Sequence, residues 1–211
     1  MALHYLNKTT DYQIGIWKIE EDEEQLFKLS GSTQQPTFVN QVRKLEYLAV
    51  RSMALEMGIQ GTAIAYMPSG KPYIINSSQS ISISHTKNYV AVMLSAHEQI
   101  GVDLEHRSER VRKIRHKFMH PHEENRLKQT SNPIDETVAL LLHWCAKEAL
   151  FKAVPEDGVD FAQELRIREF PILDVSGRFE GTFLRTGRKF KIDYRVEPDF
   201  VLTCSFSTES K

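Results

Sequence analysis

Two acidic residues in the segment Gly101-Val102-Asp103-Leu104-Glu105 are the first that could carry chemistry. The segment reads as a β-strand, where alternate side chains share a face, so Asp103 and Glu105 should point the same way with Cα atoms about 6.6 Å apart. Carboxylates that close repel each other unless a cation lies between them. A hard divalent ion such as Mg²⁺ binds carboxylate oxygens together with substrate phosphates. Taken alone, the pair would more often be a solvated strand end.

A second group lies in the segment His143-Trp144-Cys145-Ala146-Lys147-Glu148-Ala149-Leu150-Phe151-Lys152. The apolar pattern predicts a helix over residues 137–154, and on a helix Trp144, Glu148 and Lys152 share one face. Glu148 would then complete a site of three carboxylates, and Lys152 would reach a phosphate oxygen one turn further on. A plain Glu–Lys pair on a helix surface would have the same spacing.

Two shorter segments offer contacts for an anion. Lys71 stands in the turn Ser69-Gly70-Lys71-Pro72, where its ammonium group can meet a phosphate. Ser84 and His85 end an alternating strand and offer a hydroxyl, an imidazole and backbone N–H donors. Each segment alone is more simply read as a surface turn or a satisfied strand end.

In this order, the four motifs resemble those of the 4'-phosphopantetheinyl transferases. They are Gly70-Lys71-Pro72, Ser84-His85, Gly101-x-Asp103-x-Glu105 and Trp144-x-x-Lys147-Glu148-Ala149-x-x-Lys152. The chain looks like the longer, pseudo-twofold branch that includes the surfactin-synthetase activator. The resemblance covers about residues 40–155 by motif and the whole length by element order. It departs at Cys145, where Ser or Thr is frequent, and at Ile81-Ser82, where Phe-Asn is frequent. Neither departure removes a ligand.

The resemblance implies a role for each matching residue. The metal ligands would be Asp103, Glu105 and Glu148, with Mg²⁺ as the ion and Mn²⁺ as the alternative. The coenzyme A contacts would be Arg43, Lys71, Ser84, His85 and Lys152. Of these, His85 would lie near the 3'-phosphate and Lys152 near the diphosphate. Glu148 and Lys152 would be the catalytic residues.

The implied activity is transfer of 4'-phosphopantetheine from coenzyme A to a serine of an acyl or peptidyl carrier protein, with release of 3',5'-ADP. Such a step depends on positioning the diphosphate and neutralising its charge. The base for the serine proton would be Glu148 or a metal-bound water beside it. The carrier would belong to fatty acid, polyketide or non-ribosomal peptide biosynthesis, and the sequence does not choose among these.

The element pattern predicts an α+β fold made of two similar α/β subdomains. The resemblance implies that a pseudo-twofold relates them, with the coenzyme A and metal site in the cleft between them. We expect residues 1–105 to form the first subdomain and residues 106–211 the second. Helices are expected at 20–29, 38–57, 109–118 and 137–154, and another short helix is expected to start at Pro121. Strands are expected at 12–19, 62–67, 72–75, 81–84, 89–95, 100–105, 165–170, 178–184, 189–196 and 200–206, those of the first half as an antiparallel meander, with a polar linker at 131–135.

Composition excludes several other classes of protein. The 211 residues carry a net charge of −1, so the protein lacks the overall positive charge that would attract nucleic acid. Two cysteines are too few for a framework of disulfide bonds. The first 17 residues lack the apolar core of a signal peptide. We therefore expect a cytoplasmic monomer whose partners are coenzyme A and a carrier protein, with no nucleic acid and no membrane. The histidines near Glu123 (His116, His120 and His122) are interpreted as surface residues rather than a zinc site.

Two other functions share the same residues. A Mg²⁺-dependent phosphohydrolase of a nucleotide-like substrate could use the same three acids. A non-catalytic protein that binds coenzyme A or a carrier could use the same phosphate contacts. The complete set of Asp103, Glu105 and Glu148 favours catalysis over binding alone.

Overall fold

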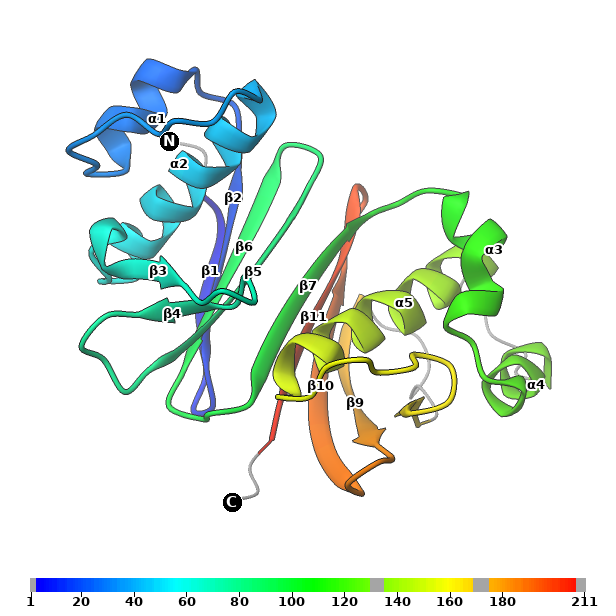
Figure 1. Ribbon diagram of the computed structural model, residues 1–211. Coiled ribbons are helices and arrows are strands. Elements are labelled where there is room, and N and C mark those ends of the chain that lie inside the picture. Colours follow the sequence, from blue (N-terminus) through cyan, green and yellow to red (C-terminus); the bar gives the residue numbers. More distant parts are fainter. Residues whose placement is uncertain (1–2, 130–134, 169–174, 208–211) are drawn as a thin grey trace. The chain divides into compact units, whose positions relative to one another are not determined.

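The structure is a computed structural model that describes residues 3–129, 135–168 and 175–207. Contacts divide the chain into two compact units, residues 1–98 and 99–211. The strand β7 (Ile100–His106) groups with the second unit, whereas the sequence placed its acids in the first. The reason is its pairing, because β7 is hydrogen-bonded along its length to β11 (Phe200–Phe206). The described part of each unit combines helices with antiparallel strands (Figure 1).

The first unit contains a four-stranded sheet, a separate hairpin and two helices. Its elements are β1 (Leu3–Lys8), β2 (Gln13–Lys18), α1 (Glu23–Leu29), α2 (Gln41–Glu56), the 3-10 helix η1 (Gly61–Ala63), β3 (Ile64–Tyr66), β4 (Pro72–Ile74), β5 (Ser80–Thr86) and β6 (Tyr89–Ser95). The sheet has the order β1-β2-β6-β5, and β3 pairs only with β4 among the described residues. The turn between β3 and β4 is closed by the Gly70 N–H, which donates to Met67 O, and Gly70 has a φ of 86° that favours glycine.

Helix α2 is held on this sheet by its apolar face. Asn40 caps its N-terminus by accepting a hydrogen bond from the Arg43 N–H at 3.2 Å. Further along, Leu48 and Met53 are fully buried, and Met53 lies directly over Gly15 of β2. This packing fixes the first turns of α2, where Arg43 lies, relative to the sheet.

In the second unit, the described residues form a five-stranded sheet and three α-helices. Its elements are β7 (Ile100–His106), α3 (Arg110–Ile114), the 3-10 helix η2 (Arg115–Lys117), α4 (Pro121–Gln129), α5 (Glu136–Ala153), β8 (Leu165–Ile167), β9 (Ser176–Phe183), β10 (Arg188–Val196) and β11 (Phe200–Phe206). The strand order is β7-β11-β10-β9-β8, and every pair is antiparallel. Asp135 caps α5 by accepting from the Thr137 N–H. In the described residues, none of the helices is long and apolar enough to cross a membrane.

Helix α5 lies along β7 and β11 and buries most of its residues (Figure 1). The approach is close because β7 has no side chain at Gly101. A Cβ at that position would lie 1.9 Å from the carbonyl oxygen of Ala149. The glycine of the Gly-x-Asp-x-Glu segment therefore lets the backbone of α5 approach the strand that carries the acids.

Most predicted elements are present, with two differences among the described residues. The strand Leu3–Lys8 was not predicted, and it extends the first sheet by pairing with β2. The meander expected for the first half is not formed, because β3 and β4 make a separate hairpin, β2 pairs with β6, and β7 pairs with β11. Residues 130–134 and 169–174 lie outside the described residues, and with them most of the linker expected at 131–135 and the end of the strand expected at 165–170.

Candidate functional site

The face of β7 that meets α5 carries both acids of the first motif. Asp103 is 5% exposed, and its Oδ1 atom lies 2.7 Å from the Nζ atom of Lys152. Glu105 accepts a hydrogen bond of 2.7 Å from the indole N–H of Trp144. The predicted alternation on the strand and the predicted helical face thus meet, and Lys152 supplies positive charge next to Asp103.

The third acid, Glu148, interacts electrostatically with both acids of β7. Burial, together with the charges of Asp103 and Glu105 and against the opposing charge of Lys152, raises the pKa of Glu148 to about 7. Burial and the charge of Asp103 also raise the pKa of Glu105, against the hydrogen bond from Trp144. Two glutamates with raised pKa values beside the carboxylate of Asp103 make an environment that a cation would stabilise.

Cys145 is a core residue in this structure. It is fully buried, its thiol donates to the carbonyl oxygen of Asp103 at 3.2 Å, and burial raises the pKa of the thiol. Thr203 donates its hydroxyl to the Cys145 carbonyl oxygen at 2.8 Å. A buried thiol of raised pKa is a poor nucleophile. Cys145 therefore fixes the register between α5 and the sheet, a task that a serine or threonine hydroxyl could also perform.

Lys147 has a structural role that the motif alone did not reveal. Its side chain is fully buried, and its Nζ atom donates to Glu123 Oε2 at 2.7 Å, Phe118 O at 2.6 Å and Phe161 O at 3.0 Å. Glu123 also accepts from the backbone N–H of Ile167 at 2.8 Å. One buried ion pair thus joins α5, α4, β8 and two loops, with every donor of the ammonium group used.

The ion pair also secures the surroundings of the indole that holds Glu105. Trp144 contacts the rings of Phe118 and Phe161, with centroid distances of 5.2 and 5.7 Å. These are the two residues whose carbonyl oxygens Lys147 holds. Sequence analysis missed Glu123 because nothing local marks an acid on α4 as the partner of a lysine on α5. Its position three residues after His120, whose N–H it accepts at 2.9 Å, resembles an ordinary helix-capping residue.

The three acids fit a divalent cation by the chemistry of their donors. All are carboxylates, and burial and mutual repulsion raise the pKa of Glu105 and Glu148. The three carboxylates are not close enough together to coordinate one ion as they stand. Within residues 3–129, 135–168 and 175–207, no group of three or more His, Cys, Asp or Glu side chains is arranged to hold a metal ion. A cation here would have to draw the carboxylates together and compete with Lys152 for Asp103.

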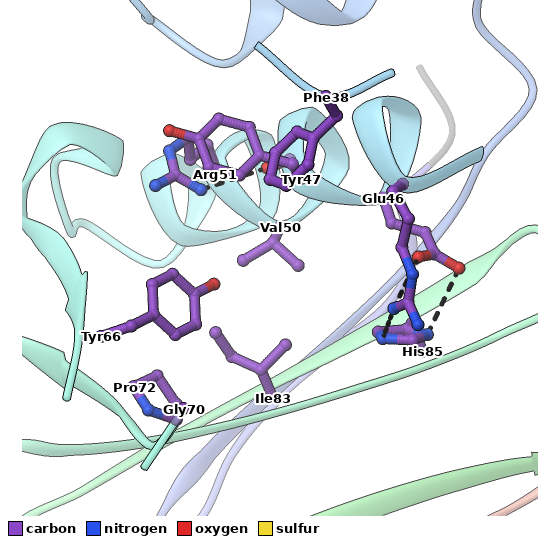
Figure 2. A pocket seen from close by; sticks show the side chains of 11 residues that line it. Phe38, Glu46, Tyr47, Val50, Arg51, Tyr66, Gly70, Pro72, Ile83 and His85 are labelled. Atoms are coloured by element: carbon purple, nitrogen blue, oxygen red, sulfur yellow. Dashed lines mark hydrogen bonds and ion pairs between the residues drawn. The ribbon is translucent and has the colours of Figure 1, made fainter. Parts of the chain in front are cut away.

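The first unit has a cavity of about 480 Å³ between α2, the β3–β4 turn and β5. Its aromatic side chains are Phe38, Tyr47 and Tyr66, and its basic side chains are Arg43, Arg51 and His85 (Figure 2). The buried guanidinium of Arg51 lies 3.3 Å from the centre of the Tyr47 ring, which holds that ring in place. Aromatic faces and cations around one cavity of this size suit a nucleotide-like ligand.

The structure places the predicted contacts of the first unit differently. Arg43 and His85 come together in the cavity, with 2.8 Å between Arg43 Nη1 and His85 Nε2. Lys71 is exposed, and its neighbours Gly70 and Pro72 line the cavity. Ser84 is buried and does not line the cavity, because successive residues of β5 alternate and Ile83 and His85 take the cavity face.

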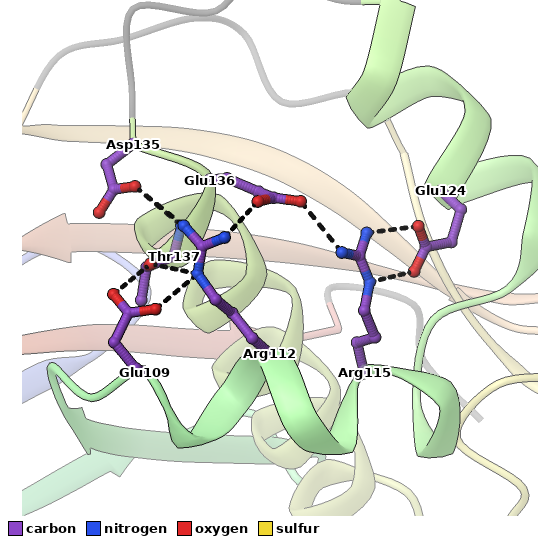
Figure 3. A network of polar contacts seen from close by, with 7 residues as sticks. All are labelled: Glu109, Arg112, Arg115, Glu124, Asp135, Glu136 and Thr137. Carbon is purple, nitrogen blue, oxygen red and sulfur yellow. Dashed lines mark hydrogen bonds and ion pairs between the residues drawn. The ribbon is translucent and has the colours of Figure 1, made fainter.

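Two arginines of the basic segment formed by α3 and η2 are paired with acids of the second unit. Arg112 forms ion pairs with Glu109, Glu136 and Asp135 at 2.6, 2.5 and 3.4 Å, and Arg115 pairs with Glu124 and Glu136 at 2.5 and 3.0 Å (Figure 3). The positive charges that the sequence shows at these two positions are therefore balanced by acids of α4, α5 and the loop before α3.

Comparison with protein families matches residues 99–205 to the 4'-phosphopantetheinyl transferase superfamily. The matched segment exceeds half of the chain and contains Asp103, Glu105, Glu148 and Lys152, whereas the cavity residues of the first unit lie outside it. A search of curated proteins finds no match. The family match includes the acids of β7 and the motif of α5. This chain therefore belongs to the 4'-phosphopantetheinyl transferase superfamily, whose chemistry is phosphopantetheinyl transfer.

Proposed function

We propose that the chain moves 4'-phosphopantetheine from coenzyme A to a serine of an acyl or peptidyl carrier protein. The carrying observation is that Glu148 of α5 faces Asp103 and Glu105 of β7 beside Lys152, within the matched segment. In the reaction the serine oxygen forms a bond to the β-phosphorus, and the bond from that phosphorus to the bridging oxygen breaks. 3',5'-ADP leaves with the bonding electrons.

Asp103, Glu105 and Glu148 are proposed to hold Mg²⁺, with Mn²⁺ as the alternative. When bound, the ion would neutralise charge on the diphosphate, which is the main requirement of such a transfer. The support is the donor set itself, three carboxylates of which two have raised pKa values. Lys152 would turn from Asp103 to a diphosphate oxygen, because a partly exposed ammonium group can exchange one oxyanion for another.

Glu148 is also the proposed acceptor of the serine proton. A carboxyl group works best as a general base when its pKa lies near the operating pH. Burial and the neighbouring acids bring the pKa of Glu148 to about 7 in the protein without a metal ion, and a bound cation would lower it. Trp144 is proposed to keep Glu105 in place through its indole N–H, so that the acids stay arranged while Glu148 exchanges a proton.

The nucleotide end of coenzyme A is proposed to occupy the cavity of the first unit. The aromatic rings of Tyr47 and Tyr66 would contact the base, and Arg43, His85 and Lys71 would contact phosphate groups. Ser84 would take part only through its backbone, since its side chain faces away from the cavity. The carrier pathway, the monomeric state, the cytoplasmic location, the relation to the pseudo-twofold branch and a cleft shared by two subdomains stay predictions of the resemblance.

Intact-mass analysis of an apo-carrier incubated with the protein, coenzyme A and Mg²⁺ tests the proposal. Transfer adds the phosphopantetheine mass to the carrier and releases 3',5'-ADP. A phosphohydrolase would release free phosphopantetheine and leave the carrier unchanged, and a binding protein would change neither. The matched control is Glu148→Gln, which keeps size and polarity but removes the charge and the base. A variant as active as the wild type would exclude Glu148 from the chemistry.

A further inference from the structure

In the cavity, the two predicted ligands Arg43 and His85 contact an acid that was not predicted, Glu46 (Figure 2). His85 Nδ1 lies 3.3 Å from Glu46 Oε1, and His85 Nε2 lies 2.8 Å from Arg43 Nη1. Arg43 Nη1 lies 3.4 Å from the other oxygen of Glu46. Glu46 therefore contacts both basic groups, and both lie in the same cavity.

The chemistry of the two neighbours orients the imidazole of His85. A carboxylate can only accept a hydrogen bond and a guanidinium can only donate one. Nε2 therefore accepts from Arg43, which leaves the proton of the neutral ring on Nδ1, the atom nearest Glu46. The acid is the least exposed of the three side chains, since Glu46 is 14% exposed while His85 and Arg43 are 38% and 58% exposed. The acid lies behind the two basic groups.

A carboxylate is an unexpected group in a site for an anion, and its net effect there could have either sign. As a nearby negative charge, Glu46 would weaken phosphate binding through repulsion. As the partner of Nδ1, it would hold the ring and stabilise the imidazolium that His85 must become to donate from Nε2 to a phosphate oxygen. Its low exposure and its contacts to both basic groups favour the second effect.

We infer that Glu46 is a positioning residue that holds His85 and Arg43 ready for a phosphate group at the nucleotide end of coenzyme A. The inference rests on the proposed function. It adds that the affinity of this end for phosphate depends on an acidic residue. Arg43 and Glu46 lie three residues apart on α2, so one helix turn supplies both the guanidinium group and the acid that contacts His85.

Isothermal titration of the full chain with coenzyme A and with dephospho-coenzyme A, which lacks the 3'-phosphate, tests this role. We expect Glu46→Ala to weaken coenzyme A binding about tenfold, the usual loss for one charged hydrogen bond, and to change dephospho-coenzyme A binding less than about twofold. Glu46→Gln keeps an oxygen for Nδ1 but no charge, so its loss should be intermediate. Glu56→Gln removes an exposed acid of the same helix and should bind both ligands as the wild type does.

A double-variant cycle separates positioning from general electrostatics. If Glu46 acts through His85, Glu46→Ala in a His85→Ala background should cost little further affinity. Additive losses, equal losses for both ligands, or tighter coenzyme A binding by Glu46→Ala would each overturn the inference. In those cases the wild type still binds coenzyme A and the proposed function stands. A wild type that does not bind coenzyme A would overturn the proposed function together with the inference.

Discussion

The ammonium group of Lys152 lies 2.7 Å from Asp103 Oδ1 and 2.9 Å from the carbonyl oxygen of Val102. A side chain of α5 thus supplies positive charge at the point where a divalent cation is proposed to bind. Cation and ammonium group compete for one carboxylate, whereas in the reaction both are needed on the diphosphate.

Lys152→Met should therefore have opposite effects on metal binding and on transfer. Loss of the competing charge should tighten Mn²⁺ binding by on the order of threefold, and loss of the phosphate contact should lower kcat. Electron paramagnetic resonance of free Mn²⁺ measures the first and carrier modification the second. Lys117→Met, at an exposed site of the same unit, is the control. Weaker Mn²⁺ binding by Lys152→Met would contradict competition at Asp103.

Gly101→Ala should destabilise the second unit by about 2 kcal/mol or more, since overpacking against backbone cannot be relieved by a rotamer change. The added Cβ would lie 1.9 Å from the carbonyl oxygen of Ala149. Urea unfolding gives the free energy of unfolding. Gly181→Ala is the control, because its nearest neighbours are the ends of the Leu150 and Ile192 side chains, which can move. Equal losses for the two variants would mean that α5 adjusts easily.

Lys147→Met should lower the free energy of unfolding by about 3–5 kcal/mol, because it leaves the buried carboxylate of Glu123 without its cation. The double variant Lys147→Met with Glu123→Gln removes both charges and keeps an oxygen for the backbone N–H of Ile167. It should be more stable than Lys147→Met alone. Chemical denaturation measures both. A double variant less stable than Lys147→Met would argue against an ion pair as the main interaction.

His143 should make stability depend on acidic pH. Burial lowers its pKa from 6.5 to about 4, and its Nδ1 atom bonds to the carbonyl oxygen of Ala139 at 2.8 Å. As pH falls below 6.5, His143 becomes protonated in the unfolded chain, whereas in the folded chain it stays neutral until about pH 4. The folded state therefore loses about 3 kcal/mol over that window.

Because the raised pKa of Glu148 acts in the opposite direction over part of this window, the quantity to measure is the difference between the wild type and His143→Leu. That difference in the free energy of unfolding should decline from pH 6.5 to 4 and stay level below. The control is Asn125→Ala, which changes an exposed residue without an ionisable side chain and should give a level difference throughout. A level difference for His143→Leu would show that the His143 ring is protonated as easily in the folded state as in the unfolded state.

If the basic stretch after Glu105 docks an acidic carrier protein, Lys113→Glu should raise KM for that carrier at low salt while KM for coenzyme A stays unchanged. Lys113 is exposed on α3, and charges at the rim of an interface act mainly on association. Arg112→Glu is unsuitable for this test, because it would place a fourth acid among Glu109, Asp135 and Glu136. Steady-state kinetics with Lys128→Glu as the control measures the effect. An unchanged carrier KM would move the docking surface away from α3.

Local rules were sufficient for the residues of the second unit's motifs. Alternation along residues 100–105 placed Asp103 and Glu105 on one face of a strand, and both now contact α5. Helical spacing placed Trp144, Glu148 and Lys152 on one face of α5, and that face meets the acids. Both patterns depend only on the repeat of a single element, and the sequence contains that repeat in full.

Relations between distant elements were decided by the tertiary structure. Nothing in residues 100–106 indicates that β7 pairs with β11 rather than β6, because either neighbour would bury the same apolar side chains. The partners Glu46 for His85 and Glu123 for Lys147 depend on how a helix packs against another segment. Such contacts join residues far apart in the chain, and periodicity within one element carries no information about which surface will cover it.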